Sequence, residues 1–403
     1  MELTVLIIFI AAGLSLVLPE KIRKLKGYFL ALFPTGVFIY FLFQTTKIGA
    51  VGALVNTYSW IPSIGLYFQF TLDGLSLIFA LLITGIGAFI LVYVHQYMRS
   101  YAHKKRFYFY LMIFMGSMLG MVLSSNLVVL FVFWELTGIS SFLLIGFKHK
   151  EEQTRKAALQ ALLVTGFGGL MMLAGFVLLG ITSGTFNIQE LIAQSNAITE
   201  HPFYLAILIL ILGGAFSKSA QFPFHFWLPG AMQAPSPVSA FLHSATMVKA
   251  GVYLLIRLNP VLGGTPEWQT IIPLFGGLSM VIGAYLALTQ KDIKAILAYT
   301  TISALGILML MIGIDTELAM KGALIYLIVH ALYKGTLFMV AGAIDKKTGT
   351  RDIDQLGNLA RTMPITTIVT LLALLSMMGM PPMIGFVGKE VIYEAKMQAP
   401  NLH

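Results

Sequence analysis

Residues 213–258 read GGAFSKSAQFPFHFWLPGAMQAPSPVSAFLHSATMVKAGVYLLIRL. Two apolar segments are separated here by a run that holds four prolines. Lys218 lies in the first segment, and His243 and Lys249 lie in the second. Ionisable side chains are costly at membrane depth, so they are rare there and by default indicate function. The stretch therefore predicts an interrupted membrane helix with basic groups beside the break.

The composition is that of a membrane protein. Of 403 residues, 58% are hydrophobic and 11% are charged, whereas soluble chains carry roughly 25% charged residues. The chain has no cysteine, which excludes disulfides and thiolate ligands for metals or iron–sulfur clusters. Apolar runs of the length that crosses a hydrocarbon core recur throughout. We expect an all-α polytopic fold with twelve spans, near residues 4–19, 28–46, 72–94, 107–123, 126–147, 157–182, 203–222, 236–257, 269–289, 293–314, 321–344 and 364–395.

Basic residues are distributed unevenly over the connections between these spans. If the first connection faces the cytoplasm, that side and its span edges hold 18 of the 26 Lys and Arg residues, and the outside holds 4. This bias predicts a bacterial cytoplasmic membrane protein with its N-terminus outside. It also explains the net charge of +9 without a nucleic-acid partner. The inside set includes Lys21, Arg23, Lys24, Lys26, Lys291 and Lys294. Four lysines belong to no connection: Lys218, Lys249, Lys334 and Lys389.

The outside connection at residues 47–71 differs from the others. Its segment GLYFQFTLD alternates apolar and polar residues and is flanked by Tyr58, Trp60 and Tyr67. This pattern predicts a short strand or an interfacial hairpin with an aromatic anchor. Asp73 follows it and is interpreted as a helix cap.

Two proline-containing runs predict helix breaks, one with Pro223 and Pro229 and one with Pro381 and Pro382. A proline removes a backbone hydrogen bond, and lipid cannot satisfy the freed carbonyl groups. Each break must therefore face protein or a water-filled cavity. Lys218 lies just before the first break; the alternative is a lysine that extends to the membrane interface.

Two pairs of basic groups lie within predicted spans. His243 and Lys249 would be about 9 Å apart along a continuous helix, close enough for a water or an intervening hydroxyl to bridge them. His330 and Lys334 are four residues apart and share a helix face. The alternatives for the histidines are hydrogen-bonded core residues or haem ligands.

One acidic residue, Glu135, lies in the middle of a predicted span. A carboxylate there is costly unless it is paired or protonated, so Lys218 or Lys249 is the expected partner; a static structural ion pair is the alternative. Together these groups predict a proton path across the membrane midplane. We find no nucleotide loop, redox ligand set or nucleophile, so we expect no cofactor, no metal site and no enzymatic activity in this chain. The candidate proton-transfer residues are Glu135, Lys218, His243, Lys249, His330, Lys334 and Lys389.

The chain resembles the antiporter-like family, which includes proton-pumping subunits of respiratory complex I and Mrp-type cation/proton antiporter subunits. The motifs that carry this resemblance are FVFWELTGISSFLLIGF (131–147), the stretch 216–255, HALYKGTLFMVAGAIDKKTGTRDI (330–353) and GMPPMIGFVGKE (379–390). Within the family, the run from Asp73, LHSATMVKAGVYL and GAIDKKTGTRDI are most similar to the A-type subunits of Mrp antiporters.

The resemblance implies a core of fourteen helices built as two inverted five-helix repeats, with helices 7 and 12 broken. It assigns Glu135 and Lys218 to a pair that modulates proton affinity, and His243 and Lys249 to a central relay. It also implies that the chain is C-terminally truncated and works in a hetero-oligomer. We expect N-terminal helices and the hairpin at 1–106, a first repeat at 107–257 and an incomplete second repeat at 258–403.

The leading hypothesis is therefore a proton-translocating subunit of a multisubunit Na+/H+ antiporter. The alternative is a proton-pumping membrane subunit of NADH-quinone oxidoreductase or a related hydrogenase, with the redox chemistry in partner chains. An inert scaffold subunit is a third hypothesis. The transported cation cannot be read from the sequence, because no oxygen-rich cluster marks a cation cage.

Overall fold

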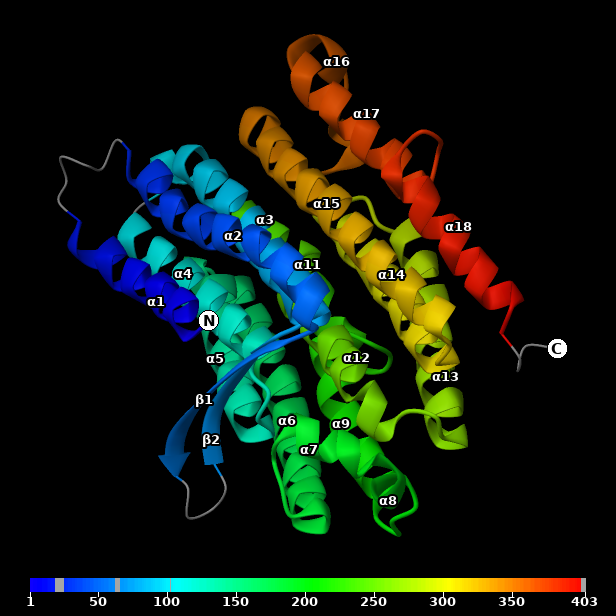
Figure 1. Ribbon diagram of the computed structural model, residues 1–403. Coiled ribbons are helices and arrows are strands. Elements are labelled where there is room, and N and C mark those ends of the chain that lie inside the picture. The colour runs from blue at the N-terminus through cyan, green and yellow to red at the C-terminus, as the bar shows by residue number, and fades with distance from the viewer. Residues whose placement is uncertain (19–24, 62–65, 102, 400–403) are drawn as a thin grey trace. The chain divides into compact units, whose positions relative to one another are not determined.

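The structure is a computed structural model that describes residues 1–18, 25–61, 66–101 and 103–399 (Figure 1). Lys21, Arg23 and Lys24, which the sequence argument uses, lie outside the described residues. For Trp60, only the backbone is described.

The chain forms two compact units. Unit 1 comprises Met1–Ala215 and Pro260–Leu262, and unit 2 comprises Phe216–Asn259 and Gly263–His403. The elements of unit 1 are α1 (Glu2–Val17), α2 (Lys26–Val51), β1 (Leu54–Ile61), β2 (Leu66–Leu72), α3 (Gly74–Tyr97), η3 (Met98–Ser100), α4 (Lys104–Leu123), α5 (Leu127–Ile145), η4 (Gly146–Lys148), α6 (Glu152–Ser183), α7 (Ile188–Ala193), α8 (Ser195–Thr199) and most of α9 (Tyr204–Lys218).

Unit 2 begins at the end of α9. Its elements are η5 (Phe224–Phe226), α10 (Trp227–Gly230), η6 (Ala231–Gln233), α11 (Ser236–Ser244), η7 (Met247–Lys249), most of α12 (Ala250–Leu262), α13 (Pro266–Leu288), α14 (Ile293–Ile314), α15 (Glu317–Thr348), η8 (Ile353–Gln355), α16 (Leu359–Thr362), α17 (Pro364–Met378) and α18 (Ile384–Met397). In this unit α15 packs against α11, α14, α17 and α18.

The predicted all-α membrane fold is confirmed. Within the described residues, nine helical segments are long and apolar enough to cross a membrane, and α1, α9 and α17 are shorter apolar helices. Each of the twelve predicted spans overlaps one of these twelve segments, and the last span also overlaps α18. The count of twelve membrane crossings stays a prediction, because the three shorter helices do not reach the length of a full span.

The outside connection forms the predicted hairpin. β1 and β2 pair antiparallel, from Leu54 opposite Leu72 to Ile61 opposite Leu66. Asp73 caps α3 as expected, since its carboxylate accepts from the Ser76 backbone N–H at 2.9 Å. Capping satisfies a donor that the first helical turn leaves without a partner. The hairpin and α3 are thus joined by a defined turn.

Glycine permits α13 and α14 of unit 2 to pack closely. A Cβ on Gly276 of α13 would lie 2.7 Å from the Leu310 nitrogen, and one on Gly306 of α14 would lie 2.5 Å from the Gly276 carbonyl oxygen. Small residues at such positions let helix backbones approach closely, a common device of membrane helices. The α13–α14 pair supports the part of unit 2 that carries the buried lysines.

Candidate functional site

The first break begins where α9 ends. Lys218 is the last residue of α9, and its side chain is 1% exposed. Ala220 then adopts a left-handed backbone with φ 48°, and Pro223 precedes the 3-10 turn η5. Because Lys218 is buried, its position argues against the alternative of a lysine that extends to an exposed interface.

Polar groups of unit 2 hold the chain at this break. The Phe222 backbone N–H donates to the Ser279 hydroxyl of α13 at 2.9 Å. The Trp227 indole N–H donates to the Ser217 carbonyl at 2.9 Å. Backbone groups that lose their helical partner must find one in protein, because lipid offers none. The break is therefore a defined part of the structure.

The span expected at 236–257 is not one continuous helix. α11 ends at Ser244, and Thr246 (φ −128°, ψ −100°) separates it from η7 and α12. The hydroxyls of Ser244 and Thr246 both donate to backbone carbonyls of α11, so neither donates to the neighbouring basic groups. His243 and Lys249 therefore lie on separate helical segments, and the expectation of one continuous helix over residues 236–257 is wrong.

Buried lysines connect neighbouring elements of unit 2 through main-chain carbonyls. Lys249 is fully buried, and its Nζ donates to the Leu327 carbonyl of α15 at 2.9 Å. Seven residues further along α15, Lys334 is also fully buried. It donates to the Leu297 carbonyl of α14 at 3.2 Å and to the Thr300 hydroxyl.

A third lysine continues this series. Lys294 lies three residues before Leu297 on α14 and is 1% exposed. Its Nζ donates to the carbonyls of Met232 and Ala234, at 2.8 and 2.6 Å, at the end of η6. The prediction grouped Lys294 with Lys291 at an inside connection and its span edges; in the structure Lys294 is buried, whereas Lys291 is exposed. We call the set the lysine path: Lys249, Lys334 and Lys294.

The partners of these lysines are neutral oxygens. Among the described residues, neither Lys249 nor Lys334 belongs to an ion pair. A carbonyl or hydroxyl oxygen accepts a hydrogen bond from an ammonium group and from a neutral amine alike. Each of the two lysines can thus lose or gain a proton without breaking an ion pair.

On α15, His330 lies between Leu327, whose carbonyl accepts from Lys249, and Lys334. Its ring contacts Tyr333 edge-on, with centroids 5.3 Å apart, and lies 6.3 Å from the Tyr326 ring. Both Lys249 and Lys334 interact with it electrostatically. Neither imidazole nitrogen has a hydrogen-bond partner in the described part of the protein. This geometry does not fit the alternative of a hydrogen-bonded core histidine.

His243 has a similar setting on α11. Its ring is fully buried and lies 6.3 Å from Trp227 and 6.1 Å from Phe338, measured between centroids. Phe338 is one turn beyond Lys334 on α15. Both nitrogens of His243 again lack a partner among the described residues. Along α15, His330 thus lies one turn before Lys334. His243 of α11 packs against Phe338, one turn after Lys334.

The second break differs in its surroundings. α17 ends at Met378, Gly379 is left-handed (φ 76°), and α18 begins at Ile384. Lys389 is partly exposed and reaches back across Gly379 to donate to the Met378 carbonyl at 2.8 Å. Pro381 and Pro382 are both exposed.

Glu135 belongs to unit 1. It lies on α5, where its Oε1 occupies the space that a side chain at Gly169 of α6 would need. The other candidate residues lie in unit 2. A pairing of Glu135 with Lys218 or Lys249 therefore stays a prediction.

Sequence reasoning missed three residues of this site. Lys294 follows Asp292, which caps α14, and nothing in the sequence separates it from the solvated Lys291. Tyr326 and Tyr333 surround His330, and their hydroxyls are 3.5 Å apart; their spacing of four and three residues from His330 could have predicted a shared face. In the described residues, no group of three or more His, Asp or Glu lies together as a metal site would require.

A family model described as "NADH:quinone oxidoreductase/Mrp antiporter, TM" matches residues 124–402, well over half of the chain. The chain belongs to this family. A second model, for the N-terminus of chain 5 of NADH-ubiquinone oxidoreductase (complex I), matches residues 59–108. The predicted resemblance to the antiporter-like family is thus confirmed.

Relatives point to the A-type subunits. The chain is 46% identical over 392 residues to the A-type subunit of the Na(+)/H(+) antiporter of Alkalihalophilus pseudofirmus, covering 94% of this chain and 49% of that protein. It is 46% identical over 342 residues to the A/B-type subunit of a probable K(+)/H(+) antiporter of Rhizobium meliloti, covering 85% of this chain and 34% of that protein. The chain therefore spans about half the length, or less, of these curated relatives.

The fold is also similar to solved structures. A chain of the Mrp complex from Dietzia sp. DQ12-45-1b superimposes with a TM-score of 0.92 and 39% identity, covering 99% of this chain and 43% of that one. The likeness confirms the predicted antiporter-like membrane fold over nearly the whole chain.

Proposed function

We propose that this family member moves protons through unit 2 as part of a multisubunit monovalent cation/proton antiporter. The observation that carries the proposal is the lysine path. In it, Lys249, Lys334 and Lys294 each donate to a neutral oxygen of a neighbouring element. The relatives described as Na+/H+ and K+/H+ antiporter subunits support the same function. The protein is then part of a transporter and not an enzyme.

The path works by repulsion between neighbouring charges. His330 interacts electrostatically with Lys249 and with Lys334, so a proton on either lysine disfavours a positive charge on His330. A proton then moves on along α15 toward α14. Burial strengthens this repulsion, because few water molecules screen it.

Entry to the path is proposed at Lys218 and Glu135. An opposite charge near a lysine favours its protonated form. If Glu135 pairs with Lys218 in one state and releases it in another, the affinity of Lys218 for a proton changes between them. The transported cation is proposed to be Na+, with K+ as the second possibility given by the relatives.

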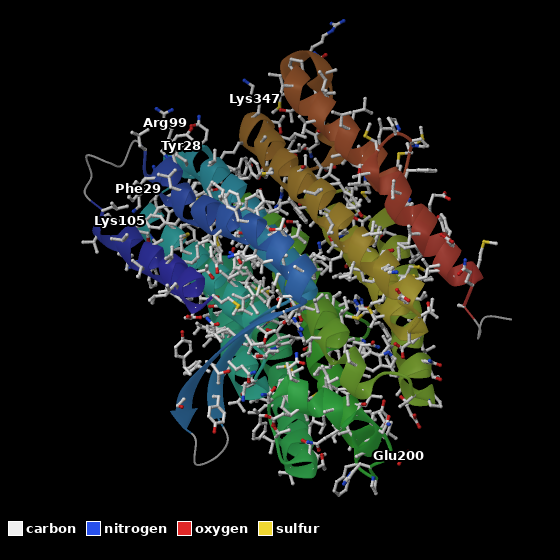
Figure 2. All side chains as sticks on the ribbon, in the orientation of Figure 1. Tyr28, Phe29, Arg99, Lys105, Glu200 and Lys347 are labelled. Carbon is white, nitrogen blue, oxygen red and sulfur yellow. The ribbon has the colours of Figure 1, made fainter. Side chains whose placement is uncertain are left out.

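The chain is proposed to lie in a bacterial cytoplasmic membrane with its N-terminus outside, together with other subunits. Figure 2 shows Arg99 and Lys105 at one end of unit 1 and Glu200 at the other, as the charge bias requires. Since the chain has no cysteine, Glu200→Cys and Lys347→Cys give single labels. A membrane-impermeant maleimide should label Glu200→Cys in intact cells and Lys347→Cys only in everted vesicles; the reverse pattern excludes this orientation.

The proposed function is tested with the complete complex in everted vesicles. The vesicles are energised by ATP hydrolysis, so that no electron donor is present, and proton release is followed on addition of Na+ or K+. The wild-type complex should release protons in response to the cation, and Lys218→Ala should abolish this response while the subunits still co-purify. A full response in that variant supports the scaffold hypothesis instead.

The second candidate function is a proton-pumping subunit of a redox-driven complex. The match to a model shared with NADH:quinone oxidoreductase favours it. Under the same conditions, such a complex would not respond to cations and would move protons only with a quinone reductant or hydrogenase substrate. The vesicle experiment therefore separates the two functions.

A further inference from the structure

Unit 1 contains a cavity that the proton path does not use. It has a volume of about 1040 Å³ and lies where α4, α5, η4 and the start of α6 meet. Its apolar walls include Tyr110, Phe142, Leu143, Phe147 and Leu159. Its rim carries five basic side chains, which define the basic pocket: Arg106, Lys148, Lys150, Arg155 and Lys156.

Two of these cations are compensated by neighbouring carboxylates. Lys148 lies 3.4 Å from Glu151, and Lys156 lies 2.8 Å from Glu152. All four side chains are at least one-third exposed, and ion pairs at the surface are weak. They leave the rim with an excess of positive charge.

The other three cations have no carboxylate partner among the described residues. Arg155 is aligned along the rim, because its guanidinium donates to the carbonyls of His149 at 2.8 Å and Lys150 at 3.2 Å. Arg106 and Lys150 are exposed. An arginine fork with neighbouring cations is suited to the oxygens of a phosphate diester.

An apolar stripe continues from the pocket along the outer face of α6. Leu159, Leu163, Phe167 and Leu170 are 50%, 62%, 62% and 62% exposed. Their spacing places them on one face of the helix, over roughly 16 Å at 1.5 Å per residue. This length is about half of a ~30 Å hydrocarbon core, which is the depth of one leaflet.

We propose that the basic pocket binds an anionic phospholipid. The phosphate lies against Arg106, Lys150 and Arg155, and an acyl chain follows the stripe on α6. Basic pockets between membrane helices on the cytoplasmic side are suited to anionic headgroups. A free phosphate ion shares the headgroup chemistry but makes no use of the apolar walls and stripe, so the observations favour a lipid.

The proposal is tested on the purified complex by native mass spectrometry with added dioleoylphosphatidylglycerol. The test variant carries Arg106→Gln, Lys150→Gln and Arg155→Gln. The control variant loses the same charge at exposed positions outside the pocket, with Lys105→Gln, Lys347→Gln and Arg361→Gln. We expect at least about tenfold weaker lipid binding in the test variant and binding close to wild type in the control.

Two further arms identify the source of the phosphate. Dioleoylphosphatidylcholine should not compete with the anionic lipid, and neither inorganic phosphate nor glycerophosphoglycerol should displace it at equal concentration. Displacement by inorganic phosphate would assign the pocket to a free anion. Equal lipid binding by the test and control variants overturns the proposal. If another subunit fills the pocket, the substitutions leave lipid binding unchanged, and this result also overturns it. The single variant Arg106→Gln, at an exposed side chain, keeps the test available if the triple variant does not assemble.

Discussion

The two helix breaks of unit 2 share a sequence pattern and differ in their surroundings. Both combine prolines with a lysine, and both end an apolar helix. At the first break Lys218 is 1% exposed, and α13 supplies a hydroxyl to the freed backbone. At the second, Pro381 and Pro382 are exposed and Lys389 is partly exposed. The same motif therefore gives a closed site in one place and an open one in the other.

The difference shows that a proline and a lysine create only the possibility of a proton site. Unit 2 also packs α11 and α14 around α15, and there Lys249 and Lys334 are fully buried and donate to neutral oxygens. Lys389 also donates to a carbonyl, yet solvent reaches its side chain and can screen its charge. Variants of the two regions should therefore have effects of different size.

After Lys218 and Lys249, whose substitution is expected to abolish release, the largest effect on transport is expected for Lys334→Ala. This change removes the middle lysine of the path, and the proton must then cross between α15 and α14 without a carrier. Cation-dependent proton release in everted vesicles should fall by roughly 10²-fold, the lower end of what a positioned proton-transfer group contributes. Normal release in an assembled complex would mean that protons bypass α15.

Lys294→Met should lower the stability of the fold, in addition to removing a lysine of the path. It removes a charged donor from the buried carbonyls of Met232 and Ala234, which costs about 3 kcal/mol. The temperature at which the purified complex loses its fold, followed by intrinsic fluorescence, should fall by several degrees. The control Lys291→Met lies two residues from the start of the same helix and is exposed, so it should leave this temperature nearly unchanged. Equal effects would contradict the buried position of Lys294.

Thr300→Val should have a smaller effect on proton transport than Lys334→Ala. Valine keeps the shape but removes the hydroxyl that accepts from Lys334. A lost hydrogen bond of about 1 kcal/mol changes proton flux about fivefold. Thr336→Val serves as the control, because that exposed hydroxyl donates only to the carbonyl of Leu332 on its own helix. Equal transport by the two variants would mean that the Thr300 hydroxyl plays no part in the path.

The smallest effect is expected for Lys389→Ala. Because this lysine is partly exposed, water can replace it, and flux should fall by no more than about twofold on the scale of a screened surface charge. The measurement is the same cation-dependent proton release. A loss as large as that of Lys334→Ala would show that the second break is as closed as the first in the assembled complex.

Much of the fold could be predicted from the sequence because membrane helices satisfy their own backbone. Long apolar runs therefore marked the spans, alternation marked the hairpin, and Asp73 marked a cap. The interruption at Thr246 could not be predicted in this way. The sequence around it, SATMV, contains neither proline nor glycine, so nothing in the sequence marks a break there.

The candidate site was predictable in its residue types but not in its connections. Lys218, Lys249 and Lys334 stood out because they lie inside apolar spans. Lys249 and Lys334 donate to main-chain carbonyls, which every residue has, so no sequence pattern can point to these acceptors. Lys294 lies at the edge of a span, where a solvated lysine and a buried one look alike until the packing of η6 is known.

Proton flux through Lys249 is the sharpest test of the lysine path. The complete complex is reconstituted, and cation-dependent proton release is compared between wild type, Lys249→Ala and Lys249→Met, with assembly verified by co-purification of all subunits. Both substitutions are expected to abolish release while the complex stays intact. Release at the wild-type rate in either variant would contradict a proton path through the buried lysines of unit 2.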